Sequence, residues 1–274
     1  MRRRNFQLIL SLALLGEILL SGLLAPWLAP YDPNQPDMSA RLEGPSAAHP
    51  LGTDALDRDL LSRALYGGRA SILVALAATA LSMAFGLLVG VLGGWFGGVT
   101  DWALTVFANI FQGLPGTCLM IAIAGVLGPG TPNLLLALVL TSWAGFSRVV
   151  RTETLRVREE AYIEGLRSLG AGQVRLLWRH AVSNMLGKIV VLFTTWAGRC
   201  VLSIASLSYL GLGIRPPTPD WSVMISDAWL HYRSAPRLMI VPGLCIFFLL
   251  LSVNLLGNVL RDRLDVRFRE VSEL

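Results

Sequence analysis

The chain has 274 residues, of which 54% are hydrophobic and 15% are charged, and its mean hydropathy is +0.59. A soluble domain carries about 25% charged residues, so this composition excludes an ordinary soluble protein and makes lipid the expected solvent. The net charge is +5, and because the arginines stand at the ends of apolar runs, we attribute it to membrane topology and expect no nucleic-acid partner.

Six apolar segments are long enough to cross a bilayer, which takes about 20 mostly apolar residues per helix. They cover 7–28, 70–96, 102–127, 133–150, 184–208 and 238–257. The predicted fold class is therefore all-α, a polytopic membrane protein with six transmembrane helices. Cys118, Cys200 and Cys245 fall inside these segments, so we interpret them as small buried apolar residues.

The first apolar segment follows Arg2, Arg3 and Arg4, as the core of a signal peptide does. The apolar stretch is longer than the ~7–15 residues of such a core, and it contains Glu17. We expect residues 1–29 to form a short tail and a retained helix. Residues 30–69 would be a periplasmic loop with a short amphipathic helix, since its prolines exclude a long one.

The second segment carries Gly86, Gly90, Gly94 and Gly98 at four-residue spacing. Such a stripe lets a neighbouring backbone approach closely. We expect tight helix packing here, not a phosphate-binding loop, which needs a lysine after its glycines.

Arginine placement predicts the orientation of the chain. With the amino terminus inside, the inner segments hold twice as many arginines as the outer ones. Positive residues collect on the cytoplasmic side, so both termini, including the tail 258–274, are predicted to be cytoplasmic.

The cytoplasmic loop 151–183 has the pattern of two short amphipathic helices. Apolar residues from Leu155 to Leu169 recur at helical spacing, Gly170-Ala171-Gly172 interrupts them, and a second helical stretch runs through Trp178. One interpretation is a pair of helices lying on lipid headgroups, as arginine-rich amphipathic helices do.

The same loop resembles the cytoplasmic signature of binding-protein-dependent ABC transporter permeases, which is Glu-Ala-Ala, three residues, Gly, nine residues, Ile-x-Leu-Pro. Here Glu164-Gly165-Leu166 precedes Gly170 at the same spacing, with Gly165 and Leu166 in place of the alanines and Ser183 in place of the proline. Four more segments are similar to those of the peptide and nickel permeases: 51–63, 208–213, 216–221 and 254–262. In the first of them, Asp57 replaces a usual glycine.

The resemblance implies an ABC importer type I permease fold, with residues 70–257 as its five-helix core, in the bacterial inner membrane. It implies a heterodimer with a second permease subunit, two cytoplasmic ABC ATPase subunits and a periplasmic solute-binding protein. The solute would be a peptide, nickel or a metal chelate such as a metallophore. By the same resemblance, the residues coupling this chain to an ATPase are Glu159, Glu160, Tyr162, Ile163, Glu164, Gly165, Leu166, Arg167, Gly170 and Ala171.

An ATPase would need a P-loop, in which a lysine after the last glycine is followed by Ser or Thr. The sole lysine, Lys188, is followed by Ile189 inside the fifth segment. We therefore expect a transport subunit that is not an enzyme and binds no cofactor, with ATP and Mg on partner subunits.

Arg199 lies near the middle of the fifth segment, where a charge costs about 3 kcal/mol on insertion scales and usually faces a polar cavity or a partner. We interpret Arg199, with Ser203, as candidate substrate-path residues suited to a carboxylate-bearing solute. The alternative is an ion pair with Glu17 or with an acid of the partner permease.

Few other residues suggest a site. His49, His180 and His231 are isolated from one another, so no metal site is predicted. Asp220 and Asp227 are expected to be solvated loop residues, and the alternative is a surface that meets the binding protein.

An intramembrane protease and an ion-coupled secondary transporter are the two alternative functions. An intramembrane protease would need a histidine at membrane depth to activate Ser147. An ion-coupled secondary transporter would use charges near the midplane, but only Glu17 and Arg199 are available there, and no inverted repeat is visible.

Overall fold

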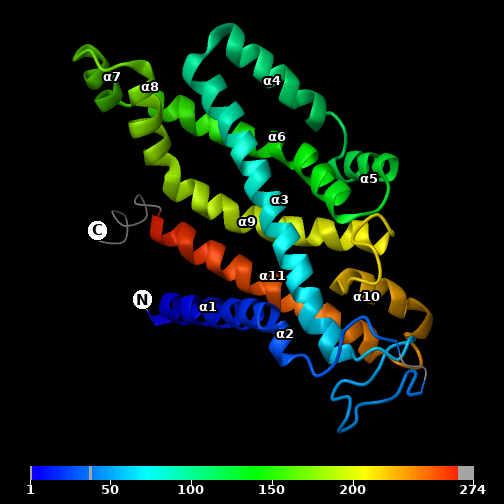
Figure 1. Ribbon diagram of the computed structural model, residues 1–274. Coiled ribbons are helices and arrows are strands. Elements are labelled where there is room, and N and C mark those ends of the chain that lie inside the picture. Colours follow the sequence, from blue (N-terminus) through cyan, green and yellow to red (C-terminus); the bar gives the residue numbers. More distant parts are fainter. Residues whose placement is uncertain (1, 37–38, 265–274) are drawn as a thin grey trace. The chain divides into compact units, whose positions relative to one another are not determined.

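The computed structural model describes residues 2–36 and 39–264, and nearly all of this part is helical (Figure 1). Its helices are α1 Arg2–Leu23, α2 Ala25–Leu28, α3 Leu60–Phe96, α4 Gly98–Gln112, α5 Gly116–Leu127, α6 Thr131–Arg158, α7 Ala161–Ser168, α8 Gln173–Arg175, α9 Ser183–Tyr209, α10 Trp221–Ala228 and α11 Arg237–Leu264. A π-helical turn, Leu176–Val182, joins α8 to α9, and a 3₁₀ turn, Trp229–His231, follows α10. Across the described ranges, β-type pairing is limited to one bridge between Thr53 and Asp59, so the all-α prediction is confirmed.

Six spans are compatible with these helices. Within the described residues, five helical stretches are long and apolar enough to cross a membrane: α1, α3, α6, the continuous stretch from α8 through α9, and α11. The sixth is the pair α4 and α5, which is bent by 80°. The sequence predicts a single apolar segment over 102–127 and gives no bend in it. The bend falls at Pro115, which lacks an N–H and disfavours helical geometry in the residue before it.

The second span begins earlier than predicted, at Leu60. The short amphipathic helix expected in the loop 30–69 is absent from the described part of that loop, because its last ten residues are the first turns of α3. The buried Asp59 explains this start, since its Oδ2 accepts hydrogen bonds from the Ser62 backbone N–H at 2.8 Å and from the Ser62 hydroxyl at 2.7 Å. An acceptor at this position caps the free N–H groups of a new helix.

The carboxyl-terminal span also continues past its predicted end at residue 257. Helix α11 extends to Leu264, so the first part of the predicted tail 258–274 is helical. Residues 265–274 of that tail lie outside the described residues.

The chain forms two compact units. Of the described residues, the first contains those within 2–77, 124–135 and 194–259, and the second contains those within 78–123, 136–193 and 260–264.

Buried polar contacts hold the first unit together around the loop between α2 and α3. The Trp221 indole donates to the Ala64 carbonyl at 2.7 Å, and the buried Arg63 guanidinium donates to the Pro33 carbonyl at 3.0 Å. Asp57, at which the family resemblance implies a glycine, has a φ of +63°. That left-handed conformation favours glycine, and aspartate is among the few other residues that tolerate it.

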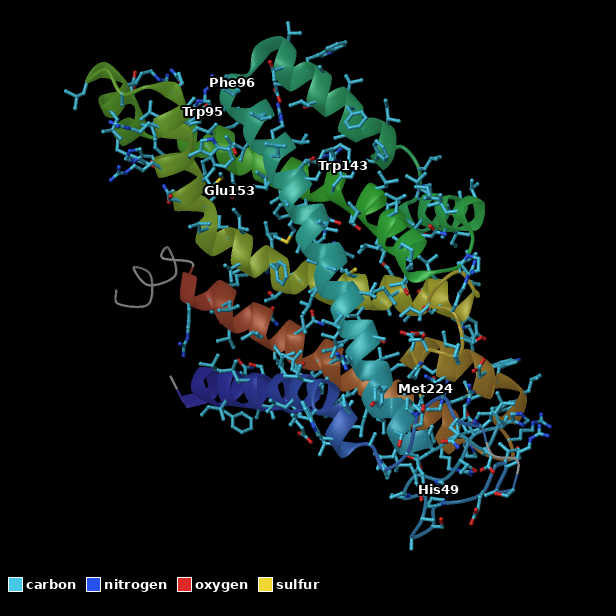
Figure 2. The ribbon with its side chains drawn as sticks, in the orientation of Figure 1. His49, Trp95, Phe96, Trp143, Glu153 and Met224 are labelled. Atoms are coloured by element: carbon cyan, nitrogen blue, oxygen red, sulfur yellow. The ribbon has the colours of Figure 1, made fainter. Side chains whose placement is uncertain are left out.

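The second unit packs around Trp143 of α6, which is labelled in Figure 2. Its ring lies 4.9 Å from that of Phe85 and 5.2 Å from that of Phe107, between centroids. A Cβ atom on Gly86 would lie 2.7 Å from the Trp143 carbonyl oxygen, and one on Gly90 would lie 2.5 Å from the Ser147 carbonyl oxygen. Gly86, Gly90 and Gly94 therefore bring α3 against α6, which confirms the predicted close packing at these three positions. Gly98, the fourth predicted member of the stripe, begins α4 and has no atom within 4 Å of its Cβ.

Candidate functional site

The predicted coupling residues, Glu159 to Ala171, lie in α7 and in the turns on either side of it. Helix α6 ends at Arg158 and α7 begins at Ala161, so Glu159 and Glu160 lie in the turn between them. Glu160 is extended, with φ −68° and ψ 136°, and its carbonyl accepts from the Ile163 N–H at 2.9 Å. The break separates α7 from the long helix before it and makes α7 an independent element.

Helix α7 ends in a turn that requires glycine. Gly170 has a φ of +85°, the Gly170 N–H donates to the Arg167 carbonyl at 3.0 Å, and the Ala171 N–H donates to the Leu166 carbonyl at 3.1 Å. This pair of bonds around a left-handed residue is the Schellman helix end. The turn predicted at Gly170 is confirmed.

One face of α7 packs inward and the other is exposed. Ile163 is fully buried and so anchors the helix, although it was predicted to belong to the coupling surface. Glu164, Gly165 and Arg167 are exposed, and Leu166 and Ala171 are half-buried. No atom lies within 4 Å of a Cβ built on Gly165, so the missing alanine methyl leaves open space.

The tip of the hairpin formed by α7 and α8 exposes apolar side chains. Leu169 is 85% exposed and Val174 is 66% exposed. Exposed apolar groups at the end of an otherwise polar element are typical of a contact surface.

Hydrogen bonds tie this hairpin to the neighbouring helix ends. The Trp95 indole donates to Gln173 Oε1 at 3.1 Å, and Arg158 Nη1 donates to the Trp95 carbonyl at 3.1 Å. The Asn184 amide donates to the Tyr162 hydroxyl at 3.0 Å. Figure 2 labels Trp95 and Phe96 at the end of α3 near the hairpin. Trp95 and Gln173 were missed from the sequence because no local pattern relates residues 78 positions apart.

Ser183, at the position of the signature proline, is helical. Because it has a backbone N–H, the chain continues from the π-helical turn into α9 without a break. The second amphipathic helix predicted for the hairpin is therefore the beginning of the long helical stretch that includes α9.

Arg199 projects from α9 and is exposed within this chain. Its guanidinium carbon lies 5.2 Å from the centroid of the Trp196 ring, a cation–π contact one turn away. Ser203 is half-buried one turn further on. Among the described side chains, Glu17 forms no ion pair with Arg199, so that intrachain alternative has no support.

Of the two aspartates expected to be solvated loop residues, Asp220 is buried, whereas Asp227 is exposed and lies in α10. Asp220 is fully buried and caps α10, and its burial raises the pKa of the carboxyl above the ordinary value, against the opposing effect of its hydrogen bonds. Asp227 is half exposed, 3.7 Å from Arg58 Nη2, and burial raises its pKa as well. Cys118 is also exposed within this chain, contrary to the expectation that all three cysteines are buried.

Comparison with known proteins decides the family. Residues 70–270 match the family described as "Binding-protein-dependent transport system inner membrane component", and residues 3–45 match "N-terminal TM domain of oligopeptide transport permease C". The chain belongs to the binding-protein-dependent permease family. This permease is therefore a multi-pass inner-membrane transport subunit of an ABC importer, as predicted, and neither a protease nor a secondary transporter is supported.

Three relatives cover most of this permease. The nickel transport system permease protein NikC of Escherichia coli K12 is 37% identical over 256 residues, which are 93% of this chain and 92% of NikC. The glutathione transport system permease protein GsiD of Pectobacterium atrosepticum is 38% identical over 246 residues, 89% of this chain and 82% of GsiD. GsiD of Escherichia coli O6:K15:H31 is 37% identical over 269 residues, 98% of this chain and 88% of that protein.

Proposed function

We propose that this permease is one half of a heterodimeric pathway in an ATP-driven importer, with both termini in the cytoplasm. A periplasmic binding protein delivers the solute, and two ATPase subunits on the cytoplasmic side hydrolyse ATP. The family membership and the arginine asymmetry support this assignment. The sole lysine, Lys188, is not part of a P-loop, and this supports the proposal that ATP is hydrolysed on other subunits.

The observation that carries the proposal is the exposed hairpin of α7 and α8. Its Gly170 turn fixes the end of α7, and the exposed Glu164 and Arg167 flank an apolar tip at Leu169. A short helix with this surface fits a groove on an ATPase subunit, with Tyr162, Gly165 and Leu166 near the contact and Glu159, Glu160 and Ala171 at its ends. Ile163 holds the helix in place from inside.

The relatives suggest the solute class. NikC is named for nickel and GsiD for glutathione, and we infer that this permease carries a peptide or a nickel or other metal chelate. Arg199 and Ser203 are candidate pathway residues, since a guanidinium exposed at this point of a membrane helix needs an anionic solute or a partner acid.

Cross-linking tests the coupling assignment. In the purified complex, with the native cysteines replaced by serine, Leu169→Cys is treated with a thiol-to-amine cross-linker. Val126→Cys, which replaces a side chain that is 89% exposed on α5, is the matched control. We expect an adduct with the ATPase subunit from the first variant and none from the second. Purification without any ATPase, or uptake by this chain alone in ATP-free vesicles, would contradict the proposal.

A further inference from the structure

A cavity of about 400 Å³, lined by both polar and apolar groups, lies in the second unit, among α3, α4 and α6. One wall is a stripe on α4 at four-residue spacing, consisting of Asp101, Thr105 and Asn109. The facing wall on α6 consists of Arg148, Arg151 and Thr152. Arg148, Arg151 and Thr152 stand where the predicted membrane segment 133–150 meets the predicted cytoplasmic loop 151–183, so this charged wall can contact an anion or a partner at the membrane edge.

The charges in this cavity do not cancel. Both Asp101 carboxylate oxygens accept from the Arg151 guanidinium, one of them at 2.6 Å, and the Thr105 hydroxyl also donates to Asp101. Asp101 and Arg151 thus neutralise each other. Arg148 is exposed, and its recorded partner among the described residues is the neutral carbonyl oxygen of Asn109, 3.1 Å from Nη2. The cavity therefore carries one uncompensated positive charge.

The free hydrogen-bonding groups are donors. A guanidinium has five N–H groups, and a single bond to Asn109 leaves others open toward the cavity. Because the Asn109 oxygen accepts from Arg148, its amide nitrogen keeps two N–H donors. The Thr152 hydroxyl is used locally, donating to the Arg148 carbonyl at 3.1 Å. A planar anion that accepts two hydrogen bonds matches this pair of donors.

We propose that Arg148 and Asn109 form a carboxylate-binding subsite for the transported solute. The inference rests on the proposed function, because it gives the permease a solute that bears a carboxylate, such as a peptide or a carboxylate metal chelate. The Asp101–Arg151 pair holds the walls of the cavity together, and Arg148 supplies the charge that attracts the solute. Two other anions have the same chemistry: a lipid phosphate and an acid of the second permease.

Charge-selective labelling of the intact complex tests the subsite. Thr152→Cys is introduced one turn from Arg148, the native cysteines being replaced by serine. Its rates of modification by carboxyethyl and aminoethyl methanethiosulfonates are measured and normalised to the neutral methyl reagent. At a separation of about 6 Å in a water-like medium, one charge changes each rate about threefold in opposite directions. We expect Arg148→Gln to lower the carboxyethyl-to-aminoethyl ratio about tenfold.

Two variants sharpen the test. Asn109→Asp places a carboxylate against the guanidinium and should lower the ratio as Arg148→Gln does. Arg175→Gln removes an exposed arginine of α8 that does not line the cavity, and it should leave the ratio unchanged. Equal ratios in the parent, Arg148→Gln and Asn109→Asp would overturn the subsite.

Lipid composition and ATPase content separate the remaining explanations. If the carboxyethyl-to-aminoethyl labelling ratio is the same in phosphatidylcholine vesicles and in vesicles containing phosphatidylglycerol, the result supports a solute site. A ratio that falls in the anionic vesicles identifies a lipid phosphate on Arg148, and absence of labelling shows that a neighbouring subunit fills the cavity. Either result overturns the subsite. ATPase retention and ATP hydrolysis in the same preparations test the proposed function independently.

Discussion

Asp220 is the N-cap residue of α10, and its side chain is fully buried. One carboxylate oxygen accepts from the backbone N–H groups of Ser222 and Val223 at 3.0 and 3.1 Å, and the other accepts from the Ser71 hydroxyl at 2.6 Å. These bonds join two segments 149 residues apart in the sequence. Burial disfavours the ionised carboxylate and raises its pKa. The stability of this site therefore depends more on the position of the acceptor oxygens than on their negative charge.

Removing the Asp220 acceptor oxygens should therefore lower the free energy of unfolding more than removing only the negative charge. Asp220→Ala leaves a helix cap and a buried hydroxyl without a partner, and it should lower the free energy of unfolding by about 2–3 kcal/mol. Asp220→Asn keeps the cap acceptor and should cost less than about 1 kcal/mol. Thermal unfolding of the purified complex measures both variants, and equal losses would contradict this explanation.

The raised pKa adds a pH dependence to the same comparison. An acid whose pKa is higher in the folded state contributes stability that is complete below its unfolded pKa and is lost as the pH rises through the folded value. The native protein should gain melting temperature relative to Asp220→Asn as the medium is acidified through this window. Asp227 is common to both proteins, so its own raised pKa cancels in the comparison.

At the scale of elements, the contact between α3 and α6 depends on the absence of side chains. A methyl group on Gly90 would approach the Ser147 carbonyl oxygen to 2.5 Å and the Val150 Cβ to 2.8 Å. Neither the backbone nor a β-branched side chain can move aside easily, so the helices would have to separate.

Gly90→Ala should destabilise the permease by about 1–3 kcal/mol, the usual cost of overpacking. Gly125→Ala in α5 is the control, because no atom lies within 4 Å of its Cβ and alanine favours a helix. Melting temperature and the yield of folded complex should fall for the first variant only. If both variants lost the same melting temperature, the cause would be a change in helix flexibility and not the contact between α3 and α6.

These elements also show what the sequence could predict. Apolar length was sufficient for the spans, and the glycine stripe and Gly170 were informative because each imposes a local steric condition. The start of α3 was missed because the buried Asp59 cap is polar, and the bend between α4 and α5 was missed because hydropathy does not register Pro115. Contacts such as Trp95–Gln173 and the cavity at Arg148 depend on tertiary packing, which no local pattern contains.

At the scale of the whole molecule, a permease must convert motion at the ATPase contact into motion of membrane helices. Trp95, at the carboxyl end of α3, is buried; its indole donates to Gln173 of the hairpin, and its carbonyl accepts from Arg158 at the end of α6. A displacement of α7 and α8 would therefore pull on α3, a helix of 37 residues. The π-helical turn at Leu176–Val182 lies at the base of the same hairpin, and such turns are frequent at functional sites.

Trp95→Phe keeps an aromatic ring in this position and removes the N–H that donates to Gln173. We expect ATP hydrolysis to continue while solute uptake per ATP falls about three- to tenfold, because coupling contacts typically contribute 0.5–2 kcal/mol. Trp102→Phe, at an indole that is 68% exposed on α4, should leave the ratio unchanged. If the hydrogen bond is the link, adding Gln173→Leu to Trp95→Phe should cause no further loss, since both changes remove one interaction. Additive losses, or an equal fall in hydrolysis and uptake, would show that Trp95 supports folding of the hairpin without transmitting its motion.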